Sequence, residues 1–212
     1  MKKLGLLLLT LLLIVSCGKD PKMTVDKFIK SIQTKKFEQA AKYTINDEFS
    51  KDMNLKYDNK TQQLFFESLF KNMKYEIISS EKQPDNSYDV KVSVENIDVQ
   101  KVFLTIYQKL FQEAFSGKGS KLSVEDEFKK ILESESVPKS KNETTFKVIE
   151  TPKGYKIDVS SENIDVLFGK FNSTLSNLNN LGEEENSIKS TDGGANSSEK
   201  PIEPLKQSNN NQ

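Results

Sequence analysis

Few residues of this 212-residue chain could do covalent chemistry. The sequence contains a single cysteine, Cys17, and has no histidine, tryptophan or arginine. A Ser-His-Asp or Cys-His triad cannot be built without an imidazole, and a zinc site would lack its usual thiolate and imidazole ligands. Bidentate recognition of phosphate or carboxylate by a guanidinium is excluded as well. The remaining reactive groups are one thiol, lysines, carboxylates and tyrosines.

A tyrosine beside a carboxylate is one catalytic arrangement that this set still permits, as in an isomerase-like or hydrolase-like site. The candidates are Tyr43, Tyr57, Tyr88, Tyr107 and Tyr155. No spacing pairs any of them with a carboxylate, and tyrosines on apolar faces are usually core residues whose hydroxyl reaches the surface. We therefore expect no catalytic residue, no cofactor and no metal site, and a tyrosine and carboxylate enzyme stays an alternative.

Cys17 ends an N-terminal segment that has the features of an export signal. Lys2 and Lys3 precede an apolar run over Leu4–Val15, which is shorter than the roughly 20 residues that span a bilayer. The residues Ile14-Val15-Ser16-Cys17 resemble the lipobox of bacterial lipoproteins. That resemblance implies cleavage between Ser16 and Cys17 and acylation of Cys17, with palmitate as an expected chain. An ordinary secretory signal with a leftover thiol is the alternative.

Composition divides the chain into four segments. Residues 1–16 are expected to be a lipoprotein signal peptide, 17–22 a lipidated tether, 23–181 a single α+β globular domain and 182–212 a disordered polar tail. The last segment is rich in Gly, Ser, Asn, Glu and Pro and has too few apolar residues to bury a core. The central segment is long enough to bury about two-thirds of its unfolded surface in one domain.

Apolar periodicity predicts the elements of that domain. A helix capped by Thr24 and a shorter helix from Phe37 should form a helical hairpin, with a third helix over about 61–73. The first β-hairpin is expected at 75–77 and 88–94, and the second at 145–149 and 155–159, around a turn at Gly154. Further helices are predicted over 99–115, over 124–132, and from about Glu162 to 179–182.

The predicted helix 99–115 has the longest apolar stripe of the chain, and we expect it to cover the sheet. A repeat also links the two hairpins, because 88–99 is YDVKVSVENIDV and 155–166 is YKIDVSSENIDV. The repeated Asn and Asp side chains could coordinate a cation, but at a strand-to-helix junction they would also cap the helix. We favour capping, since it needs no ligand.

The segment 21–43, together with the strand-to-helix step near residue 97, resembles a family of uncharacterised bacterial lipoprotein domains with a nuclear-transport-factor-2-like, or cystatin-like, fold. The matching positions are Thr24, Val25, Phe28, Ser31, Ile32, Phe37, Ala40, Tyr43, Asn96 and Asp98. The resemblance implies a helical hairpin plus a curved antiparallel sheet of β-hairpins, packed against long amphipathic helices as a cone with a pocket. In relatives, such pockets bind small molecules, peptides or partner proteins. The helix at 124–132 departs from the pattern.

These patterns predict a lipid-anchored binding or protein-interaction module on the extracytoplasmic side of a bacterial cell membrane. The expected partners are the membrane, through acyl chains on Cys17, and an unidentified small molecule or envelope protein. The formal net charge is zero and lysines alternate with carboxylates along the chain, which argues against a nucleic-acid partner. A pocketed enzyme and a structural envelope assembly factor are the alternatives.

Overall fold

The computed structural model describes residues 20–45, 56–116 and 123–189, with side chains described as far as residue 180. Within them, the chain as far as Leu175 forms one compact unit, and a second unit begins at Ser176. The predicted signal peptide, its cleavage site at Ser16 and Cys17, and the start of the tether lie outside the described residues. The description below concerns the first unit unless α9 is named.

The predicted helical hairpin is confirmed by α2 (Pro21–Gln33) and α3 (Phe37–Ala41), and the third helix by α5 (Lys60–Asn72). The predicted cap of α2 is wrong. The carboxylate of Asp20 accepts a hydrogen bond from the backbone N–H of Lys22 at 2.8 Å, and Pro21 occupies the first turn. Proline suits that position because the first N–H groups of a helix have no partner within it. Thr24 lies inside the helix instead.

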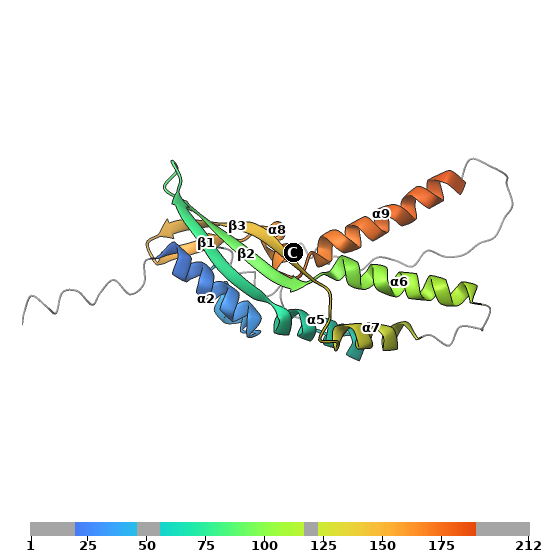
Figure 1. The fold of residues 1–212 in the computed structure, drawn as a ribbon. Coiled ribbons are helices and arrows are strands. Elements are labelled where there is room, and N and C mark those ends of the chain that lie inside the picture. The colour runs from blue at the N-terminus through green and yellow to red at the C-terminus, as the bar shows by residue number, and fades with distance from the viewer. Residues whose placement is uncertain (1–19, 46–55, 117–122, 190–212) are drawn as a thin grey trace, which may run out of the picture. The chain divides into compact units, whose positions relative to one another are not determined.

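Four strands form one antiparallel sheet in the order β1 (Lys74–Lys82), β2 (Tyr88–Ile97), β3 (Lys139–Thr151) and β4 (Gly154–Asp158). Both predicted hairpins are therefore confirmed, as is the α+β class. β3 is longer than predicted because its polar first half also pairs with β2, as far as Ile97 opposite Lys139. A register shift between Ile77 and Ser79 interrupts β1, and bulges of this kind bend strands. β1 and β2 pass over α2 (Figure 1).

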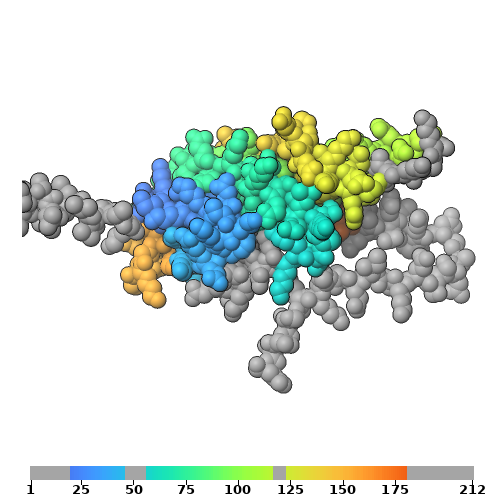
Figure 2. All heavy atoms as spheres, turned by 90° about the horizontal axis from the view of Figure 1, so that it is seen from below, coloured from blue at the N-terminus to red at the C-terminus, as the bar shows by residue number. Residues whose placement is uncertain are grey.

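The core lies between the inner face of the sheet and α2. Phe28 of α2 meets Phe146 of β3 edge to face, with 5.9 Å between ring centroids. The fully buried side chains of this layer are Val25, Phe28, Ile29, Ile32, Val90, Val92, Phe146, Val148 and Ile157. Seen from below, α2, α3, α5 and α7 (Val124–Leu132) succeed one another along the molecule (Figure 2).

The outer face of the sheet is charged, as an antiparallel sheet with one solvated face allows. Lys91 pairs across the strands with Glu143 at 2.7 Å, and Lys147 reaches Asp85 at 2.9 Å. Ser93 and Ile97 are the exceptions on this face of β2, because both are buried. β2 therefore has one buried face and one face that is largely open to solvent.

The prediction of a single last helix is wrong. The helix is divided into α8 (Ser161–Leu167) and α9 (Phe171–Lys189), because Gly169 and Lys170 adopt φ values of 64° and 61°. Positive φ ends a helix, and glycine adopts it without steric cost. α9 continues beyond the expected end at 179–182, so the first residues of the predicted polar tail are helical.

The prediction that helix 99–115 covers the sheet is also wrong. α6 (Val99–Phe115) starts where β2 ends and runs on past the sheet, with α7 beside it (Figure 1). Val99, Val102 and Ile106 are its buried residues, and all three belong to its first half. The second half carries apolar side chains that the sheet does not cover.

Candidate functional site

The most exposed apolar surface among the described side chains of the compact unit lies on α6. Leu104, Tyr107, Phe111 and Phe115 are 46, 65, 55 and 76% exposed, and we call them the aromatic stripe. Their spacing of three or four residues places them on one face of the helix. The rings follow one another, with centroids 6.4 Å apart for Tyr107 and Phe111 and 4.5 Å for Phe111 and Phe115.

A different face of α6 holds the helix to the molecule. Phe103 packs against Phe128 of α7 with 5.7 Å between ring centroids, and Lys109 forms an ion pair with Glu127 of α7. The Asp98 carboxylate caps the helix by accepting the N–H of Lys101 at 3.0 Å. α6 is therefore fixed at its start and along one side, so it presents the stripe on a supported element.

The size of the stripe separates it from scattered surface residues. A fully accessible aromatic side chain contributes about 200 Å², so the three rings together expose roughly 400 Å². Contiguous apolar patches of a few hundred Å² are the largest that monomeric proteins usually carry, and they often mark interaction sites. The stripe lacks a charged or nucleophilic group of its own, so its chemistry is that of apolar and aromatic contact.

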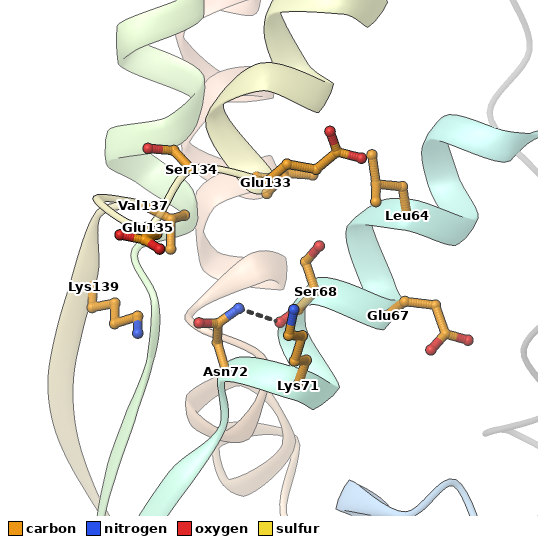
Figure 3. Close-up of a pocket in the computed structure, with 11 residues that line it drawn as sticks. Leu64, Glu67, Ser68, Lys71, Asn72, Glu133, Ser134, Glu135, Val137 and Lys139 are labelled. Atoms are coloured by element: carbon orange, nitrogen blue, oxygen red, sulfur yellow. Dashed lines mark hydrogen bonds between the residues drawn. The ribbon is translucent and has the colours of Figure 1, made fainter.

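A shallow groove of about 550 Å³ lies between α5 and the connection from α7 to β3 (Figure 3). Charged side chains of both signs and a few apolar ones line it: Leu64, Glu67, Ser68, Lys71, Asn72, Leu132, Glu133, Ser134, Glu135, Val137 and Lys139. No tyrosine is among them, and Glu67 is already paired with Lys35 at 2.7 Å. The groove thus lacks the tyrosine and carboxylate pair that an isomerase-like site would need.

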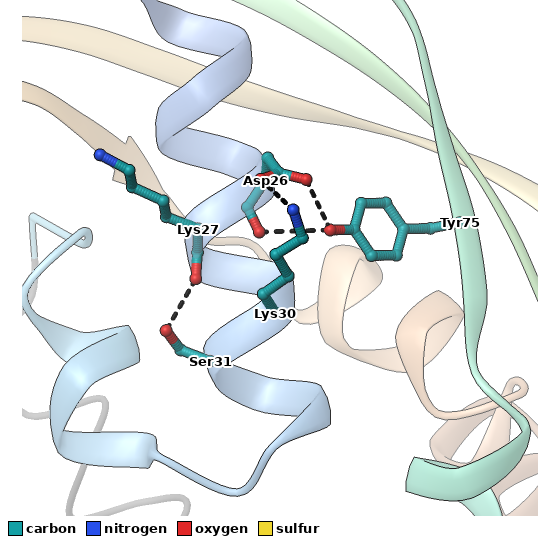
Figure 4. Close-up of polar contacts among 5 residues, drawn as sticks. All are labelled: Asp26, Lys27, Lys30, Ser31 and Tyr75. Atoms are coloured by element: carbon teal, nitrogen blue, oxygen red, sulfur yellow. Dashed lines mark hydrogen bonds and ion pairs between the residues drawn. The ribbon is translucent and has the colours of Figure 1, made fainter. Parts of the chain in front are cut away.

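One tyrosine of the described residues does meet a carboxylate, and the sequence did not single it out. Tyr75 of β1 donates a hydrogen bond to the Asp26 carboxylate of α2 at 2.7 Å, and Lys30 pairs with the same carboxylate at 2.8 Å (Figure 4). Tyr75 and Asp26 are 49 positions apart, so only the pairing of α2 with β1 brings them together.

The pKa shifts of Asp26 and Tyr75 are unfavourable for acid–base catalysis. Burial acts to raise the pKa of Asp26, but hydrogen bonds from Lys30 and Tyr75 outweigh it and leave the pKa lowered. Burial and the bond to Asp26 raise the pKa of Tyr75 well above its ordinary value. A weakened base beside a weakened acid is the opposite of what general acid–base catalysis requires. The pair instead ties α2 to the edge strand of the sheet.

The five tyrosines proposed from the sequence are dispersed. Tyr107 belongs to the aromatic stripe, and Tyr57 stacks on Phe66 with ring centroids 6.1 Å apart. Tyr88 and Tyr155 meet edge to face at 5.5 Å. Tyr155 also lines a small hollow with Tyr43, at the opposite end of β3 from α6. The structure therefore brings Tyr43 and Tyr155 together, beside four lysines and the Asp20 carboxylate, which caps α2.

The repeated Asn and Asp residues make structural hydrogen bonds. The Asn96 side chain donates to the Leu167 carbonyl at 2.7 Å, and the Asn163 side chain donates to Thr144 Oγ1 at 2.7 Å. Asp98 caps α6, and Asp165 accepts the N–H of Ser173 in the first turn of α9 at 3.1 Å. The two Asp contacts fit the capping interpretation, and the Asn96 contact joins the end of β2 to the end of α8.

The end of α8 and the end of β2 meet closely, and we call this contact between Leu167–Gly169 and Asn96–Ile97 the joint. The close approach explains why residue 169 is a glycine. A Cβ at that position would lie 2.1 Å from the carbonyl oxygen of Ile97, so only glycine lets the end of α8 rest against the start of α6. The joint fixes the direction in which α6 leaves the sheet.

Sequence reasoning missed the aromatic stripe as a site, although a signal was present. Apolar residues on α6 occupy too wide an arc for one face: Val102, Ile106 and Leu110 share one side, whereas Tyr107, Phe111 and Phe115 share another. Only one of these two apolar faces packs against the core, so the other is free for a contact outside the domain. The predicted lipidation site at Cys17 lies outside the described residues.

In comparisons with known proteins, no protein-family model, curated protein or solved structure matches the chain. Within the described residues, none of the helices has the length and apolar character needed to cross a membrane.

Proposed function

We propose that this chain is a lipid-anchored, extracytoplasmic interaction module of the bacterial cell envelope, which binds a partner protein through the aromatic stripe of α6. The observation that carries the proposal is the stripe itself, with Tyr107, Phe111 and Phe115 each more than half exposed on a supported helix. Aromatic side chains are enriched where proteins bind one another, because they bury much area at little cost in conformational entropy.

The arrangement of the elements suits a module held at one end. β3 runs from Lys139, beside the start of α6, to Thr151, beside the start of α2, and its 13 residues span about 40 Å. α2 begins at Pro21, a few residues after Cys17. An acyl anchor on Cys17 would therefore hold the α2 end near the bilayer, with the stripe directed toward the envelope space.

The anchor is tested by replacing Cys17 with serine. One acyl chain binds membranes only marginally, but the two or three chains of a lipoprotein hold it firmly. In fractionated cells the wild-type chain should be recovered with membranes, and Cys17→Ser should be released or remain as an unprocessed precursor of higher mass. A Cys17→Ser chain that is processed and stays with membranes would contradict the anchor.

The binding surface is tested by photo-crosslinking in intact cells. A photoreactive amino acid at Leu104 reports on the stripe, and the same residue at Lys91, on the outer face of the sheet, is the matched control. We expect one adduct of defined mass from Leu104 and none of that mass from Lys91. Equal adducts from both positions, or none from either, would contradict a stripe-specific partner.

The finer fold is part of the proposal. We infer a relationship to the nuclear-transport-factor-2-like lipoprotein domains, supported by the helical hairpin followed by an antiparallel meander that packs α2 on one face. The same stripe also fits an envelope assembly factor, the alternative in which the partner is a client instead of a permanent neighbour. Pulse-labelled cells irradiated at successive chase times separate the two. The yield of the Leu104 adduct should fall with chase time if the partner is a client that matures, and should stay constant for a permanent complex.

A further inference from the structure

A lysine-lined hollow lies at the end of the molecule opposite α6. Its volume is about 150 Å³, and its lining residues are Asp20, Met23, Thr24, Lys27, Lys42, Tyr43, Lys153, Gly154, Tyr155 and Lys156. The four lysines come from separate parts of the chain: α2, the end of α3, the turn between β3 and β4, and β4 itself. We call this the lysine pocket.

The positive charge of the lysine pocket is not neutralised by ion pairs. Among the described residues, the ion pairs involve other lysines, and none includes Lys27, Lys42, Lys153 or Lys156. The ammonium of Lys156 donates to the backbone carbonyl of Lys42, a contact that holds it at the pocket wall. Asp20 is the acidic residue of the lining, and its carboxylate accepts the N–H of Lys22 as the cap of α2.

Two tyrosines, Tyr43 and Tyr155, also line the pocket. The bond to Tyr88, burial, and the negative charges of Glu150 and Asp20 raise the pKa of Tyr155 to about 12, so its hydroxyl stays protonated at neutral pH. The ammonium groups of the four lysines are hydrogen-bond donors as well as charges, and donors around a positive hollow suit a phosphate or another oxyanion.

The position of the lysine pocket favours a phosphate that belongs to the membrane. Asp20 in its wall is the third residue after Cys17, so even a fully extended link spans only about 10 Å. With acyl chains on Cys17, the pocket would face the headgroups of the same bilayer. Lysines near an anionic membrane surface are attracted to it by roughly fivefold in affinity for each side chain.

We propose that the lysine pocket binds the phosphate of an anionic phospholipid headgroup in the membrane that carries the chain. The inference rests on the proposed lipid anchor, and it adds a second contact that sets orientation. With one flexible link, the domain could rotate freely above the membrane. A lipid anchor and a headgroup contact at the same end restrict that rotation, so that β3 points away from the bilayer. The aromatic stripe then faces the envelope space.

The test uses a chain that begins at Gly18, so that acylation plays no part. All buried residues of the described chain lie between Pro21 and Thr174, so this chain keeps the whole core. Vesicles of phosphatidylcholine alone are compared with vesicles that also contain phosphatidylglycerol, by co-sedimentation at low and at physiological salt. The test variant is Lys27→Gln/Lys42→Gln/Lys153→Gln/Lys156→Gln. The control, Lys101→Gln/Lys129→Gln/Lys130→Gln/Lys141→Gln, removes the same charge elsewhere.

We expect binding to the anionic vesicles only, weakened by salt, and reduced at least about tenfold in the test variant but less than about twofold in the control. Equal losses in both variants would reduce the effect to net charge and overturn the proposal. Inorganic phosphate supplies the third arm: if it binds the pocket in calorimetry while anionic vesicles do not, the ligand is a soluble anion and the headgroup is excluded. Lys27→Gln/Lys153→Gln, which keeps the contact of Lys156, replaces the test variant should that variant fail to fold.

The vesicle experiment and the test of the lipid anchor can fail independently. Membrane release of Cys17→Ser tests acylation in cells, whereas the vesicle experiment measures the pocket without Cys17. Loss of vesicle binding with an intact anchor would leave the proposed function standing and remove only the headgroup contact.

Discussion

α2 and α6 have similar amphipathic patterns, but their apolar side chains differ in burial. In α2 the apolar side chains Val25, Phe28, Ile29 and Ile32 are completely buried against the sheet. In α6 burial stops at Ile106, and the aromatic stripe continues into solvent. The difference is that α2 lies across the sheet, whereas α6 starts at the end of a strand and leaves it. An apolar stripe thus predicts a helix and a contact, but not whether the contact is within the chain.

The largest expected effect contrasts one phenylalanine from each helix. Phe28→Ala should lower the free energy of unfolding by about 3–5 kcal/mol, because it leaves a cavity beside Phe146 in a closed core. Phe111→Ala should change it by less than about 0.5 kcal/mol, because that ring is already more than half exposed. Urea unfolding followed by circular dichroism measures both. Similar losses would mean that the stripe is part of the core.

The second prediction concerns the joint that sets the direction of α6. Gly169→Ala should cost about 2–4 kcal/mol, because the new Cβ would meet the Ile97 carbonyl oxygen at 2.1 Å in a residue with φ of 64°. Gly154→Ala is the matched control, since Gly154 also has positive φ but open space around it. The control should cost only about 1 kcal/mol, from backbone strain alone. Thermal unfolding of the two variants checks the order, and equal costs would disprove a packed joint.

A smaller effect is expected at the contact that ties α2 to β1. Tyr75→Phe should cost about 1–2 kcal/mol at pH 7, where the Tyr75 hydroxyl bonds to an ionised and partly exposed Asp26. Because the folded-state pKa of Asp26 lies below its ordinary value of 3.8, this stabilisation is present above that pH and is lost as the pH falls through the folded value. The difference between wild type and variant should therefore shrink below about pH 4 in urea unfolding. A constant difference would show that the carboxylate charge is not involved.

Much of the fold follows from local patterns. The alternation at Val90, Val92 and Val94 predicts β2, and the turn at Gly154 predicts the second hairpin; both are present. The first half of β3 was not predicted, because its alternating Lys, Ser and Asn residues are polar on both faces and gain their pairing only from β2. The break at Gly169 was missed because apolar residues on both sides continue the helical pattern, and only the approach to Ile97 requires it.

The candidate sites were less predictable than the fold, for a physical reason. The Tyr75 and Asp26 pair and the lysine pocket join residues that lie far apart in the sequence, so neither has a local signature. The aromatic stripe is local, yet its exposure depends on where α6 leaves the sheet. That direction is decided by the hydrogen bond from Asn96 to the Leu167 carbonyl and by the close approach of Gly169 to Ile97.

The stripe is tested most directly by pairing a binding measurement with a stability measurement in one variant. With the photoreactive residue at Leu104, Phe111→Ser/Phe115→Ser should reduce the adduct at least about tenfold, the equivalent of about 1.4 kcal/mol of binding, with an unfolding midpoint close to that of wild type. Lys91→Ser/Lys147→Ser, on the outer face of the sheet, should leave the adduct unchanged. A stable Phe111→Ser/Phe115→Ser protein that still gives the full adduct would contradict binding through the aromatic stripe.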